Sequence, residues 1–410
     1  MSASHEPTDR VLPGLLTADL PGTGGQVRVR PKDFSVEEIP LYEPSGRGAH
    51  TFFQIEKRGI DTPRAIRLLA EALRVPAAAF SFAGLKDAQA VARQILSIEG
   101  LPPERVLRAR VVGVRVLWAR RHPKRLQIGE LRGNRFAIRI RGVLPGALER
   151  ANAILEVLAR RGMPNGFGAQ RFGYRQANHL LGQAMVRRDW AAFCEVLLGR
   201  PAPDEPDASR RAREAYQAGD LRSAQALWPP ALREERAVLR ALGAGAPPAE
   251  AALRLPQGVR RLYGAAYQSY LFNRLLSERL PTIDRLETGD LAIIHASDAF
   301  FLVEDAAREQ ERAERLEISP SGPLYGFKVR LAREAVGDRE HGLLRAEGIT
   351  RGDFRGVPGA YLVGERRAFR VPLEGLAVRQ EGDDLLLRFA LPRGAYATSL
   401  LREVIKREVA

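Results

Sequence analysis

Apolar residues change their spacing along this chain of 410 residues, and few folds fit the order in which the spacings occur. Before Gly162 they alternate with polar residues in short segments, which is typical of half-buried strands. From residue 178 to about 276 they recur at helical spacing, with Pro-rich breaks. The last segment, 398–409, is an amphipathic helix whose apolar side must be covered by another element. A helical region inserted between two parts of one sheet domain explains this order.

The predicted elements of the first part are strands and one helix. Strands are expected at residues 26–30, 34–39, 51–56, 112–118 and 135–141. Thr62 followed by Pro63 predicts the N-cap and first position of a helix that ends before Pro76. In the later strands arginines alternate with apolar residues, so we expect the arginines to face solvent. Strand-like pieces return near residues 289–303, 361–363 and 384–391.

Basic residues are concentrated in one segment of a chain whose net charge is +15. Between residues 101 and 150 thirteen Lys and Arg stand against three Asp and Glu. The candidate RNA-binding residues of this segment are Arg120, Arg121, Lys124 and Arg125, and further arginines follow at 132, 135, 139 and 141. Such clustering attracts phosphate and favours a nucleic-acid partner. The alternative is that arginine only covers solvated faces.

Several classes of protein are disfavoured by what the sequence lacks. A single cysteine, Cys194, rules out a disulfide framework and is expected to be a buried thiol. There is no signal-peptide pattern and no apolar run of about 20 residues, so we expect a soluble, cytoplasmic protein that binds no membrane. Phosphate-binding loop, dinucleotide and serine-hydrolase motifs are missing, and the histidines stand singly. A phosphate-cradling nucleotide enzyme, a serine hydrolase and a zinc enzyme are therefore disfavoured, and we expect no metal.

Asp87, in the stretch FAGLKDAQA at 82–90, is the candidate catalytic residue. A carboxylate can attack a sugar carbon or stabilise the positive charge that develops there when a glycosidic bond breaks. Taken alone the stretch is more typical of a surface turn, because Gly and Asp are ordinary turn residues. Its neighbour Lys86 either contacts RNA or is solvated.

Asp87 does not stand alone, because its stretch is one of six motif-like stretches that occur in a fixed order along the chain. They are PKDFSVEE at 31–38, FAGLKDAQAVARQ at 82–94, LQIGELRGNRF at 126–136, GMPNGFGAQRFG at 162–173, QSYLFN at 268–273 and LPRGAYATSLLRE at 391–403. In this order the chain closely resembles the TruD family of tRNA pseudouridine synthases, from about residue 20 to the C-terminus. The resemblance implies isomerisation of a uridine in tRNA, typically at position 13 in the D arm, without a cofactor.

The resemblance also implies roles for individual residues. Asp87 matches the nucleophile, and Arg28 matches the basic partner of the nucleophile, where the family usually has lysine. A positive neighbour favours the carboxylate form of an aspartate. Asn134 and Phe136 match an Asn-x-Phe motif whose ring is expected to stack on the target base. The alternative for Phe136 is a core residue, since it fits the apolar face of its strand. Arg171 is a further candidate for RNA binding.

The resemblance implies an α+β fold with two domains. A catalytic pseudouridine-synthase-like domain, 1–163 and 371–410, is built on a mixed, largely antiparallel sheet flanked by helices. A mixed α/β TRUD domain is inserted at 164–370. We expect a monomer that binds tRNA. Ala88, Gln89 and Ala92 replace residues that are usual in the family, so the resemblance does not define the finer RNA contacts at these positions. A catalytically silent RNA-binding protein and a base-releasing glycosylase remain as alternatives.

Overall fold

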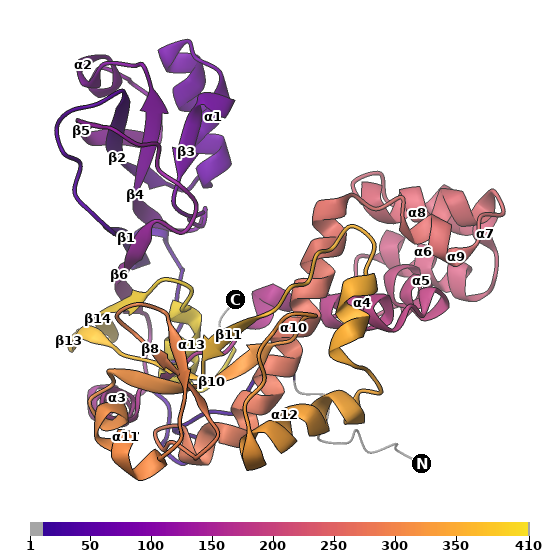
Figure 1. The fold of residues 1–410 in the computed structure, drawn as a ribbon. Coiled ribbons are helices and arrows are strands. Elements are labelled where there is room, and N and C mark those ends of the chain that lie inside the picture. Colours follow the sequence, from indigo (N-terminus) through magenta and orange to yellow (C-terminus); the bar gives the residue numbers. More distant parts are fainter. Residues whose placement is uncertain (1–10, 409–410) are drawn as a thin grey trace. The chain divides into compact units, whose positions relative to one another are not determined.

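The structure, a computed structural model, describes residues 11–408 and consists of two units (Figure 1). The first unit contains Leu15–Met163 and residues 371–408. We call it the sheet unit. The second contains residues 11–14 and Pro164–Arg370, and we call it the insertion unit. The chain therefore leaves the sheet unit after its first part and returns to complete it.

One eight-stranded sheet forms the first unit. Its strands are β1 (Phe34–Pro40), β2 (His50–Arg58), β3 (Phe80–Phe82), β4 (Val91–Glu99), β5 (Val114–His122), β6 (Leu131–Ile140), β13 (Glu374–Glu381) and β14 (Asp384–Pro392). Their order is β13-β14-β6-β1-β4-β2-β5, with β3 paired to β4. β1 and β4 are parallel, with Ser35 opposite Val91, and the other pairs of this sheet are antiparallel. The expected mixed, largely antiparallel sheet is confirmed.

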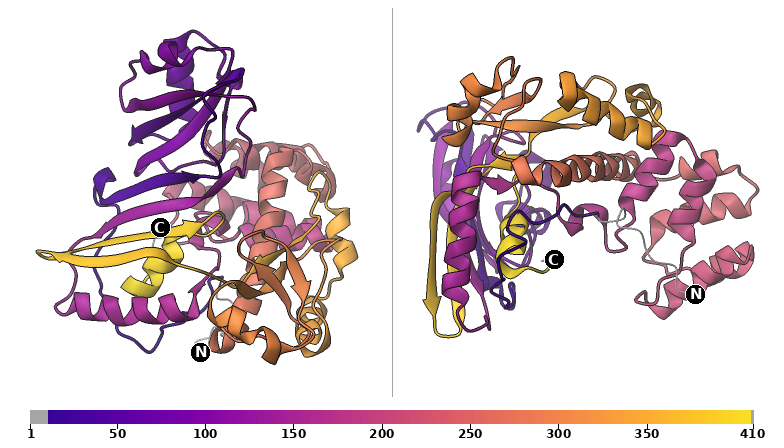
Figure 2. Two further views of the ribbon diagram at one scale, coloured as in Figure 1. Left: turned by 60° about the vertical axis from the view of Figure 1, so that its left-hand side comes forward. Right: turned by 90° about the horizontal axis from the view of Figure 1, so that it is seen from below.

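Helices cover the sheet and complete its core. They are α1 (Thr62–Leu73), α2 (Pro103–Leu107), α3 (Ala147–Arg161) and α13 (Ala397–Ile405), with short 3₁₀ helices at Pro31–Asp33 and Ala77–Ala79. Leu155 of α3 and Leu401 of α13 pack in one cluster with Ile138 of β6. Figure 2 shows both helices beside the C-terminal strands β13 and β14. Leu69 of α1 packs with Leu96 of β4 in a second cluster. The expected docking of the terminal helix on an earlier sheet is confirmed. Docking is favourable because it removes the apolar side of the helix from water.

The predicted strand at 26–30 is wrong. Gln26 makes only an isolated bridge with Arg141, and Arg28 has a φ of 60°, in the left-handed region that interrupts an extended segment. The helix start also differs by one residue. Asp61 is the N-cap of α1 and accepts a hydrogen bond from Arg64 N, whereas Thr62 is the first helical residue.

The insertion unit joins a helical region to a small sheet. Its helices are α4 (Asn178–Arg187), α5 (Trp190–Leu198), α6 (Asp207–Gln217), α7 (Leu221–Leu227), α8 (Arg233–Gly243), α9 (Pro248–Ala252), α10 (Gln257–Arg279), α11 (Ala306–Glu314) and α12 (Glu334–Ala346), with 3₁₀ helices at Ala169–Phe172, Leu280–Thr282 and Arg351–Gly356. The strands β8 (Leu291–Ile294), β9 (Phe300–Leu302), β10 (Ile318–Leu324) and β11 (Glu365–Ala368) form a sheet of order β11-β10-β8-β9. Two short strands, β7 (Met163–Pro164) and β12 (Arg370–Val371), lie where the chain passes from one unit to the other. No helix within residues 11–408 is both long and apolar enough to cross a membrane.

Candidate active site

Asp87 lies on the loop that joins β3 to β4 in the sheet unit. Its side chain is 49% exposed, and Arg28 Nη2 donates to its Oδ2 at 3.1 Å. The Arg28 side chain is only 13% exposed. A carboxylate that is accessible on one side and paired with a half-buried arginine on the other can face an outside ligand in a fixed orientation.

Arg28 is itself held in place by β1. Its Cζ lies 4.5 Å from the ring centre of Phe34, a buried residue at the start of that strand. A guanidinium stacked on an aromatic face keeps one plane, which fixes the direction in which its N–H groups point. The left-handed backbone at Arg28 is the local feature that turns the chain toward this position.

Lys57 is a site residue that sequence reasoning missed. It is fully buried in β2, and its Nζ donates to the main-chain oxygens of Asp87 at 2.7 Å, Lys86 at 3.0 Å and Ile60 at 2.7 Å. An ammonium group has three donors, and here each has an acceptor. Burial lowers the pKa of Lys57 to about 8, while the Asp87 carboxylate acts in the opposite direction. Lys57 thus holds the backbone of the Asp87 loop from the buried side of the loop.

The structure corrects the interpretation of Lys86, which is neither solvated nor presented to RNA. Its side chain is 7% exposed, and its Nζ lies 3.0 Å from Oε2 of Glu38, a buried carboxylate of β1. Burial raises the pKa of Glu38, and the Lys86 ammonium opposes that rise. Lys86 therefore points inward while the adjacent Asp87 remains accessible.

Two uncharged side chains complete the support of this loop. Lys86 N donates to Thr62 Oγ1 at 3.0 Å, and Thr62 Oγ1 donates to Gln94 Oε1 at 2.7 Å. Gln94 Nε2 donates to Gly84 O at 3.3 Å. Gln94 ends the FAGLKDAQAVARQ motif, so its place in the motif has a structural reason. The loop is held by hydrogen bonds from β2, β4 and the start of α1.

Phe136 and Asn134 lie on β6, two residues apart and therefore on the same face of that strand. The Phe136 ring is 8% exposed, stacks on Phe389 at 5.1 Å and meets Phe34 edge to face at 6.2 Å. Phe136 is thus part of the core cluster, as its strand position suggested. Asn134 Oδ1 is buried and has no hydrogen-bond partner within residues 11–408. Buried side-chain oxygens usually accept a hydrogen bond, so the environment of this amide oxygen is unusual.

The basic segment is only partly a free surface. Arg120, Lys124 and Arg125 are exposed near the end of β5, whereas Arg121 is half-buried and donates to Ala49 O at 3.4 Å. Arg125 also lines a hollow with Phe82. The loop that follows connects to the site, since Gly129 N donates to Ala83 O at 2.8 Å.

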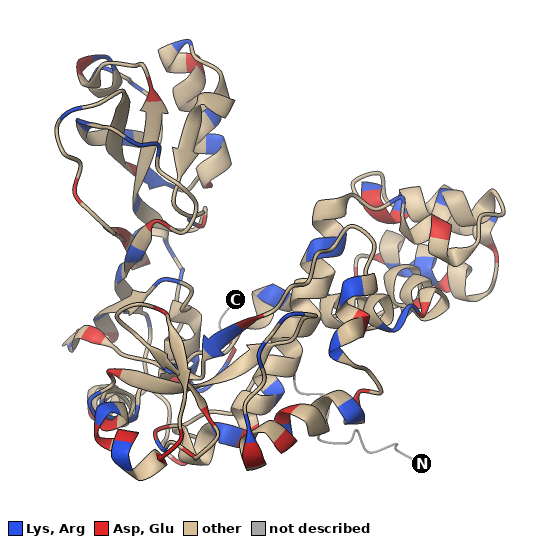
Figure 3. Ribbon diagram, in the orientation of Figure 1, with Lys and Arg blue, Asp and Glu red and all other residues tan. Residues whose placement is uncertain are grey.

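The arginines on and next to β6 lie on its more exposed face, as expected, but three of them are paired with carboxylates. Arg139 and Arg141 both contact Asp384, and Arg141 also donates to Asp33 at 2.6 Å. Arg135 lies 3.7 Å from Glu37. These carboxylates neutralise charge that the sequence pattern assigned to RNA. Figure 3 shows that Lys and Arg are distributed over both units and not confined to this sheet.

Arg171 lies in the insertion unit, on the 3₁₀ helix Ala169–Phe172. Its Cζ is 5.0 Å from the ring centre of Phe167, and Arg367 Cζ is 4.4 Å from the same ring. Asn165 of the same motif is buried, receives a hydrogen bond from Arg367 Nη2 at 2.6 Å and donates to Ala368 O at 3.0 Å. Much of this glycine-rich motif therefore serves the local fold.

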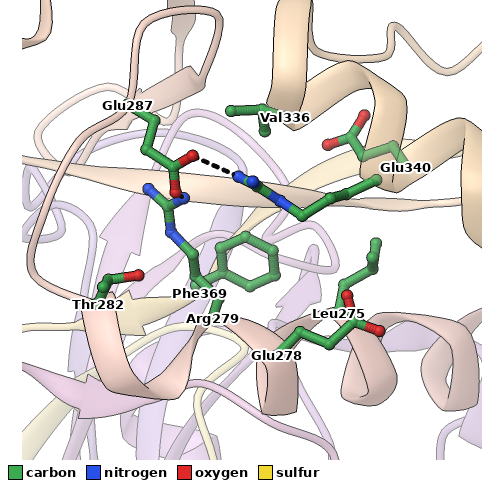
Figure 4. A pocket seen from close by; sticks show the side chains of 9 residues that line it. Leu275, Glu278, Arg279, Thr282, Glu287, Val336, Glu340 and Phe369 are labelled. Carbon is green, nitrogen blue, oxygen red and sulfur yellow. Dashed lines mark hydrogen bonds and ion pairs between the residues drawn. The ribbon is translucent and has the colours of Figure 1, made fainter.

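The insertion unit also contains a pocket beside α10 and α12 (Figure 4). Two arginines line it, and Glu287 contacts both: Arg339 donates to Glu287 at 2.6 Å, and Arg279 contacts the other carboxylate oxygen. Arg279 also donates to Asp290 at 2.7 Å. Both arginines of the pocket thus form ion pairs with carboxylates. Within residues 11–408 no group of three or more His, Cys, Asp and Glu side chains is placed to hold a metal ion.

Comparisons with known proteins cover almost the whole chain. Residues 14–404 match the model of the family described as tRNA pseudouridine synthase D (TruD). Proteins of that name from Geobacter sulfurreducens and Anaeromyxobacter dehalogenans are 47% identical over 393 residues and 38% identical over 406 residues, and each match covers 96% of both chains. A solved structure assigned to TruD from Methanosarcina mazei matches with a TM-score of 0.83 and 27% identity, over 97% of both chains.

The eight-stranded sheet and these full-length matches define the class of protein as the pseudouridine synthases. Within that class, the chain belongs to the tRNA pseudouridine synthase D family, TruD. The resemblance found from six motifs is confirmed.

Proposed function

We propose that this protein isomerises uridine to pseudouridine in tRNA, at position 13 of the D arm, and that Asp87 is the nucleophilic residue. Membership of the TruD family supports the reaction class. The observation that carries the assignment of Asp87 is its environment: a half-exposed carboxylate paired with Arg28 on a loop that buried Lys57 holds by its main chain.

The proposed reaction neither adds nor removes atoms. The bond between N1 of uracil and C1′ of ribose breaks, the base turns, and a new bond forms between C5 and C1′. The proton on C5 is released, and N1 gains one. A carboxylate beside C1′ can attack that carbon, or it can promote elimination to a glycal, and both routes need the same carboxylate in the same place.

Asn134 and Phe136 are proposed to position the base. The unpartnered Oδ1 of Asn134 is an acceptor that a uracil N–H can satisfy. The Phe136 ring offers little free surface, so its stacking with a base requires that neighbouring side chains shift when RNA binds. Extrusion of a stacked uridine costs a few kcal/mol, which such contacts offset.

Contacts with the rest of the RNA are proposed for basic residues of both units. Arg120, Arg121, Lys124 and Arg125 provide positive charge in the sheet unit, although Arg121 is the least exposed of the four. Arg171 does so in the insertion unit, which we propose is the TRUD domain. We expect a monomer that acts on tRNA in the cytoplasm.

The test is incubation of the purified protein with an unmodified tRNA transcript, followed by carbodiimide mapping of pseudouridine. We expect product at one site with wild type, and RNA binding without product for Asp87→Asn. Asp61→Asn is the matched control, because asparagine caps a helix about as well as aspartate and Asp61 caps α1. Binding without product by wild type would favour an RNA-binding protein, and release of free uracil would favour a glycosylase.

A further inference from the structure

An exposed tyrosine, Tyr361, lies against a half-buried phenylalanine, Phe327, on the insertion unit. Two neighbouring segments carry these residues, joined by a main-chain hydrogen bond from Lys328 N to Val363 O at 2.9 Å. The rings of Phe327 and Tyr361 meet edge to face, with their centres 5.2 Å apart. Tyr361 is nevertheless 72% exposed. A large ring that is fixed in place yet open to solvent offers a stacking face at a low cost in conformational entropy.

Two basic side chains lie beside this aromatic pair. Arg355 Cζ is 4.9 Å from the ring centre of Phe327, and Lys328 Nζ is 5.8 Å from it. Both side chains are exposed. Cations at these distances are attracted to the ring face, so their charge is kept next to the aromatic pair.

Two more arginines lie against the segment that leads to Tyr361. The guanidinium of Arg188 lies against Gly356, and that of Arg260 against Gly359. A Cβ at either glycine would come closer to the arginine nitrogens than real side-chain atoms do. Both guanidinium groups therefore lie directly against the main chain of this segment.

Several arginines of the same unit are paired with carboxylates. Buried Arg213 contacts Glu205, and half-buried Arg274 contacts Glu347. Within residues 11–408 none of the four, Lys328, Arg355, Arg188 and Arg260, has an ion-pair partner, and Arg260 Nε is buried without a hydrogen-bond acceptor. Lys328 and Arg355 thus keep unpaired positive charge beside the aromatic pair, and Arg188 and Arg260 add positive charge beside residues 356–359.

We propose that Phe327, Tyr361, Lys328, Arg355, Arg188 and Arg260 form an RNA-binding surface of the insertion unit, which we call the 327/361 surface. Tyr361 stacks on an unpaired base, and the cations contact phosphates on either side of it. Aromatic side chains interleaved with cations are the chemistry that single-stranded RNA requires. This inference rests on the proposed function, because it takes tRNA as the ligand.

The test compares RNA binding by variants of the 327/361 surface with matched variants elsewhere in the same unit. Tyr361→Ala is matched by Phe300→Ala, at an exposed aromatic of β9, and Arg355→Ala by Arg308→Ala, at an exposed arginine of α11. The probe is an unmodified tRNA transcript, with Kd measured at several salt concentrations. Tyr361→Ala should weaken binding about tenfold, the scale of one lost base–aromatic contact. Combining Lys328→Ala with Arg355→Ala should reduce the salt slope by about two.

The outcomes separate this inference from the proposed function. Wild-type affinity and salt slope in all variants of the 327/361 surface would overturn the inference, even if the enzyme is active. That result is also the one expected if the surface binds an acidic protein instead of RNA. Weaker binding of the test variants alone, with unchanged melting temperatures, would support the inference. It would do so even if wild type forms no pseudouridine, a result that would overturn only the proposed function.

Discussion

Replacement of Lys57 by methionine should separate the position of Asp87 from the stability of the fold. Methionine fills similar space but has no donor, so the carbonyl groups of Asp87, Lys86 and Ile60 lose their shared partner. Each buried carbonyl left unpaired costs about 1–3 kcal/mol, and removal of a buried charge returns part of that cost. We expect a net loss of about 3 kcal/mol in the free energy of unfolding.

Catalysis should suffer more than stability predicts. A displacement of the carboxylate by about 1 Å is enough to reduce a rate roughly a hundredfold. We expect that reduction in the single-turnover rate at saturating tRNA, measured as tritium released from C5 of labelled uridine, with an unchanged Kd for tRNA. Leu73→Ala is the control, because it removes a buried side chain of α1 at a cost of about 2–5 kcal/mol without contacting the loop. A Lys57→Met rate equal to that of Leu73→Ala would refute the positioning role.

Three further outcomes are expected. Arg28→Lys should retain activity within about tenfold while Arg28→Met loses much more, in the same tritium assay, because lysine keeps the charge beside Asp87 but not the planar geometry. Glu38→Gln and Lys86→Met should each cost about 3 kcal/mol in urea unfolding, and the double variant should cost less than their sum, since a buried charge left alone is worse than none. Burial lowers the pKa of His295 to about 4, whereas the pKa in the unfolded chain is about 6.5. As the pH falls below 6.5, the histidine therefore becomes protonated in the unfolded chain before it does so in the folded protein, which favours unfolding. Between pH 7 and pH 4.5 the free energy of unfolding should therefore fall by about 2 kcal/mol less in His295→Gln than in wild type. An equal fall in both proteins would contradict the lowered pKa of His295.

Strands such as β1 and β6 were predictable because buried and more exposed residues alternate along them. Phe136, Ile138 and Ile140 face one side of β6, and burial of that side explains why the pattern holds. The segment at 26–30 misled because the pattern cannot show that Arg28 has a left-handed backbone. Strand order was not predictable, since β13 and β14 pair beside β6 from the far end of the chain.

The candidate site was predictable only where a motif marked it. Asp87 was a candidate from its chemistry and was supported by the family resemblance, Arg28 came from the resemblance alone, and the structure brings the two together. The burial of Lys57 could not be predicted, because a lysine between two charged residues at the end of a strand is usually exposed to solvent. The burial of Glu38 could be: of two consecutive glutamates on a strand, alternation directs one inward. The contact of Glu38 with Lys86 depends on the pairing of β1 with β4, which no local pattern contains.

β14 pairs with β6 although it is synthesised much later, so the order of synthesis matters for this protein. Roughly 240 residues separate the end of β6 from the start of β14, and a ribosome adds about 5–20 residues per second. The edge of β6 and the core under α13 therefore stay open for about 10–50 s while the insertion unit is made. An unpaired strand edge can pair with other chains, so growing chains should be most prone to aggregation in that interval.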